Sequence, residues 1–237
     1  MAAHGPALAA QAATHLQMVL RQAAGIHGRC VVALSGGTTP ELTYRRLAGS
    51  PPGQMDTLVH LQVDERLVSP DDPRSNAAML RRCWPDASRL RLMIPGGWPG
   101  EHAISAGRLA ASYTLMMDLH APVRQRGVPV LQAVILGLGD DGHTASLFPG
   151  SEAGRERNRW VVPAAAPALA PQVPRLTMTF PVLEACEHLV FLVQGAGKAD
   201  MVATILQNGG DLPAARLRRH PAAIWFLDHA AAANLSL

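Results

Sequence analysis

The amino-acid sequence predicts a single α/β domain, residues 1–237, built around a mainly parallel β-sheet. Short apolar runs of strand length alternate with segments that carry helical spacing, and no internal repeat or long linker interrupts them. The length suffices for a substantial buried core. The composition, with 48% hydrophobic and 16% charged residues, is typical of a compact globular chain.

In the N-terminal half, each element follows from an apolar pattern and from the residues that punctuate it. An alanine-rich helix is expected to end near Gly25, and Thr39 and Pro40 suit the N-cap and first position of a second helix. The predicted helices are residues 7–24, 41–47, 75–82 and 101–120, and the predicted strands are residues 30–34, 58–63 and 90–94.

The C-terminal half begins with an apolar strand, residues 133–136, that ends abruptly in glycines, two carboxylates and a histidine. The proline-rich stretch 153–174 is expected to be an irregular surface excursion. Residues 175–180 are ambiguous. Further strands are predicted at 189–193 and 222–227, and further helices at 181–187, from Lys198 to about Gln207, and in the alanine-rich stretch after Asp228.

Composition excludes several classes of function. The net charge is only +3, the basic residues are scattered and aromatic residues are 4% of the chain, so no nucleic-acid partner is expected. We recognise neither an export signal nor an apolar run of membrane-spanning length, so no membrane partner is expected. Cys30, Cys83 and Cys186 are odd in number and far apart, which fits a reducing, cytoplasmic location.

Four loops follow predicted strands whose carboxyl ends should meet at one edge of the sheet, where open α/β sheets bind ligands. These loops are residues 35–39, 64–66, 137–144 and 195–198. His143 lies near Asp141 in the glycine-rich third loop, and histidine is the side chain best suited to moving protons near neutral pH. We therefore predict that this loop is catalytic.

The first loop, Ser35-Gly36-Gly37-Thr38-Thr39, has the parts of a phosphate-binding site. It places small residues, backbone N–H groups and hydroxyls before a predicted helix. An ordinary glycine turn is the alternative. Lys198 is the only lysine among 21 basic residues, and a cation at the start of a helix opposes the helix dipole. A bound phosphate would offset that cost.

Other motifs are incomplete. The glycines of the 137–142 segment match a dinucleotide-binding fingerprint, but its two aspartates would face the pyrophosphate and no acidic strand end follows at the required distance. The segment around Lys198 lacks the first glycine and the Ser/Thr of a Walker loop. Histidines and cysteines show no metal-ligand spacing, so neither a metal nor a cofactor is expected.

Together, these runs resemble the 6-phosphogluconolactonase family. The run Asp-Gly-His-Thr-Ala-Ser-Leu-Phe-Pro at 141–149 is the most specific, and the others, in the family's order, are 35–40, 64–66 with Ser75-Asn76, 175–177 and 195–198. The resemblance implies a Rossmann-like three-layer sandwich of the deaminase/ribose-phosphate isomerase type. It also implies a carboxylic ester hydrolase that converts 6-phospho-D-glucono-1,5-lactone to 6-phospho-D-gluconate in the pentose phosphate pathway.

The mechanism expected on this basis is direct attack of water on the lactone carbonyl, without a covalent intermediate. His143 is the expected general base and Asp141 the residue that orients it. The expected substrate- and phosphate-binding residues are Ser35, Gly36, Gly37, Thr38, Thr39, Asp64, Arg66, Arg175 and Lys198. The expected partner is the sugar-phosphate lactone, bound by a monomer or a weak homo-oligomer.

Two alternatives come from different classes. The related glucosamine-6-phosphate deaminase family resembles the chain in the same loops, but it has tyrosine in place of Arg66 and a proton-relaying glutamate in place of Phe148. A phenyl ring cannot relay a proton, which disfavours deaminase chemistry. The other alternative is a sensor that binds sugar phosphates without catalysis. His143 and Asp141 argue against it, because a sensor has no evident need of them.

Overall fold

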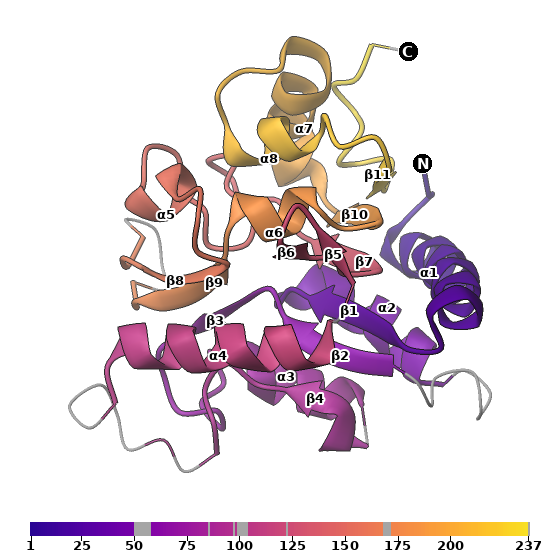
Figure 1. The fold of residues 1–237 in the computed structure, drawn as a ribbon. Helices are drawn as coiled ribbons and strands as arrows, with labels where there is room; N and C mark the ends of the chain where they lie inside the picture. The colour runs from indigo at the N-terminus through magenta and orange to yellow at the C-terminus, as the bar shows by residue number, and fades with distance from the viewer. Residues whose placement is uncertain are drawn as a thin grey trace.

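A computed structural model of the chain describes residues 1–49, 58–84, 86–96, 98, 104–121, 123–167 and 172–236 (Figure 1). Its main sheet has six parallel strands. From edge to edge, these are β11 (Ala223–Leu227), β10 (His188–Val193), β7 (Ala133–Leu136), β1 (Cys30–Leu34), β2 (Leu58–Gln62) and β4 (Leu90–Arg91). The predicted α/β fold with a mainly parallel sheet is confirmed.

Helices cover both faces of this sheet, so the fold is a three-layer sandwich (Figure 1). Alternate strand residues point to opposite faces, and in β1 the side chains of Val31 and Ala33 lie in one buried cluster while Val32 and Leu34 lie in the other. The Val32 cluster includes side chains of α1 (Gly5–His27), α2 (Thr38–Ala48) and α3 (Asn76–Cys83), and the Val31 cluster includes side chains of α4 (Ala106–His120), α6 (Phe180–Glu184), α7 (Ala199–Ala203) and α8 (Pro213–Leu217).

A smaller antiparallel sheet accompanies the main one, in the strand order β3 (Asp64–Arg66), β9 (Arg175–Met178), β8 (Val161–Ala164). The prediction of a wholly irregular 153–174 stretch is therefore wrong. Pro163 is exposed within β8, and β8 is an edge strand, where the missing N–H of a proline breaks no ladder bond. The prolines at 163, 167 and 174 lie in the described part of this stretch, and Pro171 lies outside it.

The remaining elements are short. They are the helical turns η1 (Ala87–Arg89), α5 (Glu152–Arg155), η2 (Ala196–Lys198) and η3 (Thr204–Asn208), and the hairpin strands β5 (Arg124–Gln125) and β6 (Val128–Pro129). The turns η2, α7 and η3 follow one another, as the predicted helix from Lys198 to about Gln207 requires. None of the helices within the described ranges is long and apolar enough to cross a membrane.

Two helices begin or end at residues other than those predicted. α1 passes through Gly25 and ends before Gly28, whose φ of 68° is the left-handed conformation that closes a helix. α2 begins at Thr38, with Gly37 as its N-cap, so Thr39 lies inside the helix. The φ of 111° at Gly37 explains the difference, because that backbone conformation favours glycine and turns the chain two residues earlier than predicted.

Two other predicted elements are shorter than expected. β4 covers only Leu90–Arg91, because the Gln62 side chain accepts the backbone N–H of Met93 at 2.6 Å and replaces the next ladder bond. α4 begins after Ser105, whose hydroxyl accepts the backbone N–H of Arg108. Of the predicted helix at 101–120, residues 101–103 lie outside the described residues.

The predicted helix after Asp228 is wrong, because this stretch forms turns. The Asp228 carboxylate accepts the backbone N–H of Ala231 at 2.8 Å, and such local bonds compete with helix formation. The same oxygen accepts the backbone N–H of Gly195 at 3.0 Å. Asp228 therefore ties the C-terminal turns to the loop that carries Lys198.

Candidate active site

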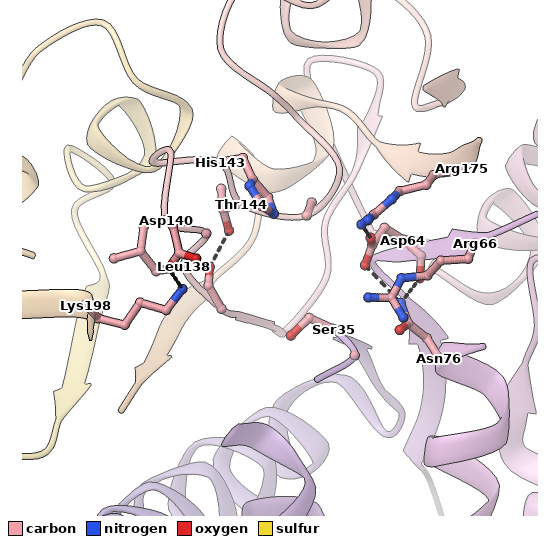
Figure 2. Close-up of a pocket in the computed structure, with 14 residues that line it drawn as sticks. Ser35, Asp64, Arg66, Asn76, Leu138, Asp140, His143, Thr144, Arg175 and Lys198 are labelled. Atoms are coloured by element: carbon pink, nitrogen blue, oxygen red, sulfur yellow. Dashed lines mark hydrogen bonds and ion pairs between the residues drawn. The ribbon is translucent and has the colours of Figure 1, made fainter. Parts of the chain in front are cut away.

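The carboxyl ends of the central strands border a cavity of about 280 Å³ (Figure 2). All four predicted loops contribute residues to it, because parallel strands end at the same edge of the sheet. β9 of the small sheet and the start of α3 complete the wall. The lining residues are Ser35, Gly36, Asp64, Arg66, Asn76, Gly137, Leu138, Gly139, Asp140, His143, Thr144, Ala145, Arg175 and Lys198.

His143 is held on three sides. Its Nδ1 lies 2.5 Å from Asp141 Oδ1, and its ring centroid lies 4.6 Å from that of Phe148. On the third side the ring packs against the backbone of Gly139, where a Cβ would lie only 2.0 Å from Nδ1. The other ring nitrogen, Nε2, has no hydrogen-bond partner among the described residues. This nitrogen is therefore available to take a proton at the cavity.

Asp141 lies behind His143 and is not part of the cavity wall. Partial burial acts to raise the pKa of its carboxyl, but hydrogen bonds from the backbone N–H and ring of His143 outweigh it, so the pKa lies below its usual value. The carboxyl is thus ionised at neutral pH. An ionised partner at Nδ1 fixes the proton on that nitrogen and leaves Nε2 as the basic position.

The loop around His143 is anchored to both sides of the cavity. The Thr144 hydroxyl donates to the Gly137 carbonyl at 2.8 Å. The Ser146 hydroxyl, which is fully buried, donates to Asp64 Oδ2 at 2.6 Å. Between them, Ala145 has a φ of 53°, a strained conformation for a residue with a side chain. The Ser146 bond holds this loop in one position relative to the small sheet.

Two arginines form one end of the cavity, at the right of Figure 2. Arg66 and Arg175 are directly opposite each other on β3 and β9. Arg175 lies 3.8 Å from Asp64 Oδ2 and is only 5% exposed. Burial is the main reason that the pKa of Arg175 lies below its usual value; Asp64 raises it and Arg66 lowers it. The guanidiniums concentrate positive charge at this end.

A lysine forms the other end, at the left of Figure 2. The ammonium group of Lys198 lies 2.5 Å from Asp140 Oδ1, while the Asp140 side chain is 71% exposed. Ser35 lies between the two ends, and its buried hydroxyl has no hydrogen-bond partner among the described residues. The cavity thus has a cation at each end and His143 along one side, which suits a small anionic molecule.

The structure separates the predicted binding residues into two groups. Ser35, Gly36, Asp64, Arg66, Arg175 and Lys198 line the cavity. Gly37, Thr38 and Thr39 line an adjoining hollow of about 220 Å³, which shares Gly36 and Lys198 with the cavity. Both carboxylate oxygens of Asp64 are engaged by protein groups, so Asp64 orients its neighbours.

Of the amide and charged side chains that line the cavity, two were not among the predicted binding residues. Asn76 extends into the cavity from the start of α3, and the sequence indicates it only through the Ser75-Asn76 pair of the resemblance. Asp140 pairs with Lys198, and the available signal is a second acidic residue beside Asp141 in a chain with a single lysine. The bond of Asn76 to Asp64 and the ion pair of Asp140 with Lys198 do not follow from local spacing, because each joins separate segments of the chain.

The fold is an α/β sandwich, and its cavity places the His143–Asp141 pair between cationic groups, an arrangement typical of enzymes that act on small anionic molecules. The family model of glucosamine-6-phosphate isomerases/6-phosphogluconolactonases matches residues 4–225. The chain is 34% identical over 232 residues to 6-phosphogluconolactonase of Nostoc, covering 94% of this chain and 90% of that protein. The chain belongs to this glucosamine-6-phosphate isomerase/6-phosphogluconolactonase family, as the resemblance predicted.

Solved structures agree with this assignment. The 6-phosphogluconolactonase of Trypanosoma brucei superimposes with a TM-score of 0.84 at 28% identity, covering 100% of this chain and 97% of that chain. A monomeric glucosamine-6-phosphate deaminase superimposes with a TM-score of 0.75 at 22% identity, covering 99% of both chains. The fold is therefore common to both activities, and the side chains of the cavity must distinguish them.

Proposed function

We propose that the chain hydrolyses 6-phospho-D-glucono-1,5-lactone to 6-phospho-D-gluconate, the second step of the oxidative pentose phosphate pathway. The observation that carries the proposal is the contact between His143 and Asp141 beside a cavity with cationic groups at both ends. Its relatives in Nostoc and Trypanosoma brucei, both named 6-phosphogluconolactonase, support it.

His143 acts first as a general base. Nε2 takes a proton from water as the water oxygen attacks C1 of the lactone, and Asp141 stabilises the imidazolium that forms. When the tetrahedral intermediate collapses, the bond between C1 and the ring oxygen breaks and His143 returns the proton to that oxygen. The products are the hydroxyl group and the carboxylic acid of the open chain, which ionises. General acid–base help of this kind contributes about 10²–10⁴-fold to the rate.

The phosphate is held by Lys198 and the backbone of the 35–39 loop, while Arg66 and Arg175, at the other end of the cavity, donate hydrogen bonds to oxygens of the sugar. Lys198 borders both the cavity and the adjoining hollow, so one phosphate reaches the ammonium group and the loop together. Holding the phosphate fixes the lactone carbonyl near His143. Such positioning converts a collision with water into a reaction within one complex.

A lactonase fits this cavity better than a deaminase. The side chain packed against His143 is Phe148, with 4.6 Å between ring centroids, so a proton-relaying carboxylate is absent from that position. The Arg175 guanidinium lies over the same ring, 5.4 Å from its centroid. Phe148 therefore holds His143 and Arg175 in place and supplies no proton.

A cytoplasmic location is part of the proposal. Cys30, Cys83 and Cys186 are all free and buried, which is typical of a reducing compartment. Burial raises the pKa of each thiol, to about 12 for Cys30 and about 11 for Cys83. The three thiols are therefore protonated and unreactive.

The test is acid release from freshly generated lactone, corrected for spontaneous opening, beside ammonia release from glucosamine 6-phosphate. We expect only the first reaction. His143→Ala should lower kcat about 10²–10⁴-fold with little change in KM, and Lys198→Ala should mainly raise KM. Exposed His229→Ala is the control. Ammonia release would favour the deaminase. Binding of 6-phosphogluconate without turnover of either substrate would favour the sensor.

A further inference from the structure

We propose that Asn76 is a specificity-determining residue that accepts a hydrogen bond from one hydroxyl group of the substrate sugar. This inference rests on the proposed lactonase function and adds to it. The acceptor is the side-chain carbonyl oxygen Oδ1. Asn76 is 2% exposed and lines the cavity, at the end formed by Arg66 and Arg175 (Figure 2).

The orientation of the Asn76 amide follows from its neighbours. Its Nδ2 donates to the backbone oxygen of Asp64 at 2.8 Å and to Asp64 Oδ1 at 3.2 Å. Both neighbours are acceptors, so the amide nitrogen must face them and Oδ1 must face the other way. No described residue donates a hydrogen bond to Oδ1. A carbonyl oxygen at a cavity wall without an internal donor is available to a ligand hydroxyl.

Gly36 provides the space that Oδ1 occupies. A Cβ at position 36 would lie 1.8 Å from Oδ1 and 2.2 Å from Cγ of Asn76. The Asn76 carbonyl therefore reaches from α3 to the loop after β1, where both residues line the cavity. This contact gives Gly36 a role besides its backbone N–H. The glycine is needed for the Asn76 side chain to adopt its position.

The backbone of Asn76 is fixed as firmly as its side chain. The Glu65 carboxylate, which is 1% exposed, accepts the backbone N–H groups of Asn76 and Ala77 at 2.7 Å each. The Ser75 hydroxyl caps the same helix by accepting the N–H of Ala78. An acceptor held in this way needs little further ordering when substrate binds, which favours selective recognition.

Asn76 supplies a function that its neighbours cannot. Arg66 and Arg175 only donate hydrogen bonds. The oxygens of Asp64 receive Ser146 Oγ at 2.6 Å and Asn76 Nδ2 at 3.2 Å. A sugar hydroxyl at this end therefore finds donors for its oxygen in the arginines, and Asn76 Oδ1 as the acceptor for its hydrogen. An analogue without that hydroxyl leaves Oδ1 unpaired, and such sites discriminate against it.

The experiment compares the parent lactone with the lactones made from 2-, 3- and 4-deoxyglucose 6-phosphate, using the wild type and Asn76→Ala. For one deoxy lactone, wild-type kcat/KM should fall roughly 3- to 10-fold, the effect of one neutral hydrogen bond, and Asn76→Ala should cause no further loss. For the parent lactone and the other two deoxy lactones, Asn76→Ala should lower kcat/KM by the same factor of roughly 3 to 10. Equal losses with all four substrates would overturn the inference. If the wild type does not hydrolyse the parent lactone, the proposed function itself is wrong.

Gly36→Ala keeps the experiment decisive if Asn76→Ala folds poorly. Its Cβ displaces Oδ1 and leaves the hydrogen bonds of the α3 backbone to Glu65 in place. It should lose selectivity for the same hydroxyl as Asn76→Ala. Asn158→Ala, which removes an amide from an exposed position, is the matched control and should keep the wild-type pattern. Retention of the wild-type pattern by Gly36→Ala, with unchanged melting temperature, would also overturn the inference.

Discussion

Replacing Gly139 by alanine should misplace His143 without touching the groups proposed to hold the phosphate. A Cβ at position 139 would lie 2.0 Å from Nδ1 and 2.2 Å from Cε1 of the imidazole. Backbone strain does not contribute, because Gly139 is not among the residues with positive φ. Alanine can adopt the same backbone conformation, so the effect of the substitution is purely steric.

The size of the effect follows from the contacts on the other sides of the ring. Ordinary contact begins at 3.4 Å, so the ring must shift by more than ~1 Å. Phe148 packs against the ring, and a shift also pulls Nδ1 away from Asp141. A 1 Å misplacement costs about 10²-fold in rate, and loss of a general base costs about 10²–10⁴-fold. We expect kcat to fall within that range and KM to change little.

The assay is acid release from the lactone, with the melting temperature measured in parallel. Gly107→Ala is the matched control, since it makes the same change in α4 with nothing within 4 Å of the new Cβ. In a Gly139→Ala background, His143→Ala should have little further effect, because both substitutions remove the same function. A well-folded Gly139→Ala enzyme with wild-type kcat would refute the reasoning.

Two further predictions concern charge. In the proposed site, Asp140 competes with phosphate for Lys198. Asp140→Asn should therefore lower the inhibition constant of inorganic phosphate about two- to fivefold at low salt, whereas the exposed control Asp118→Asn should leave it unchanged. Equal inhibition constants for Asp140→Asn and the wild type would contradict this prediction. Burial lowers the pKa of His60 from 6.5 to about 4, so the folded state resists protonation that the unfolded chain accepts. The contribution of His60 to the free energy of unfolding should therefore be constant above pH 6.5 and fall by about 3 kcal/mol toward pH 4. In urea unfolding, His60→Leu should lose less stability over this range than the wild type, by about that amount, whereas His229→Leu should lose as much as the wild type.

The sequence was most informative where an apolar run ends at a chemically distinct loop. β1, β2, β7 and β10 were predicted within one or two residues because fully buried parallel strands are continuous apolar runs. The small sheet was not predicted. Its strands have three or four residues each, one of them carries Pro163, and the pairing of β3 with β9 joins residues more than a hundred positions apart. Periodicity carries no information about such pairing.

The sequence predicted which loops contribute residues to the cavity, but it did not predict the contacts between these loops. The loops that follow parallel strands converge by topology alone, and they include Ser35, His143 and Lys198. The contacts between loops were not predictable. The bonds of Asn76 to Asp64 and the ion pair of Asp140 with Lys198 depend on how separate elements pack, and local spacing does not determine them.

The pairing of β3 with β9 shows why the second sheet matters to function. Its register places Arg66 directly opposite Arg175, and like charges opposite each other destabilise a pair of strands. A slip of one residue would turn these side chains to opposite faces of the small sheet. Asp64 and the buried Glu65, on the same strand as Arg66, offset part of this repulsion, since both raise the pKa of Arg175. The register therefore fits the proposed role of the two arginines as hydrogen-bond donors to the substrate, and binding of that substrate would recover the stability that the strands lose.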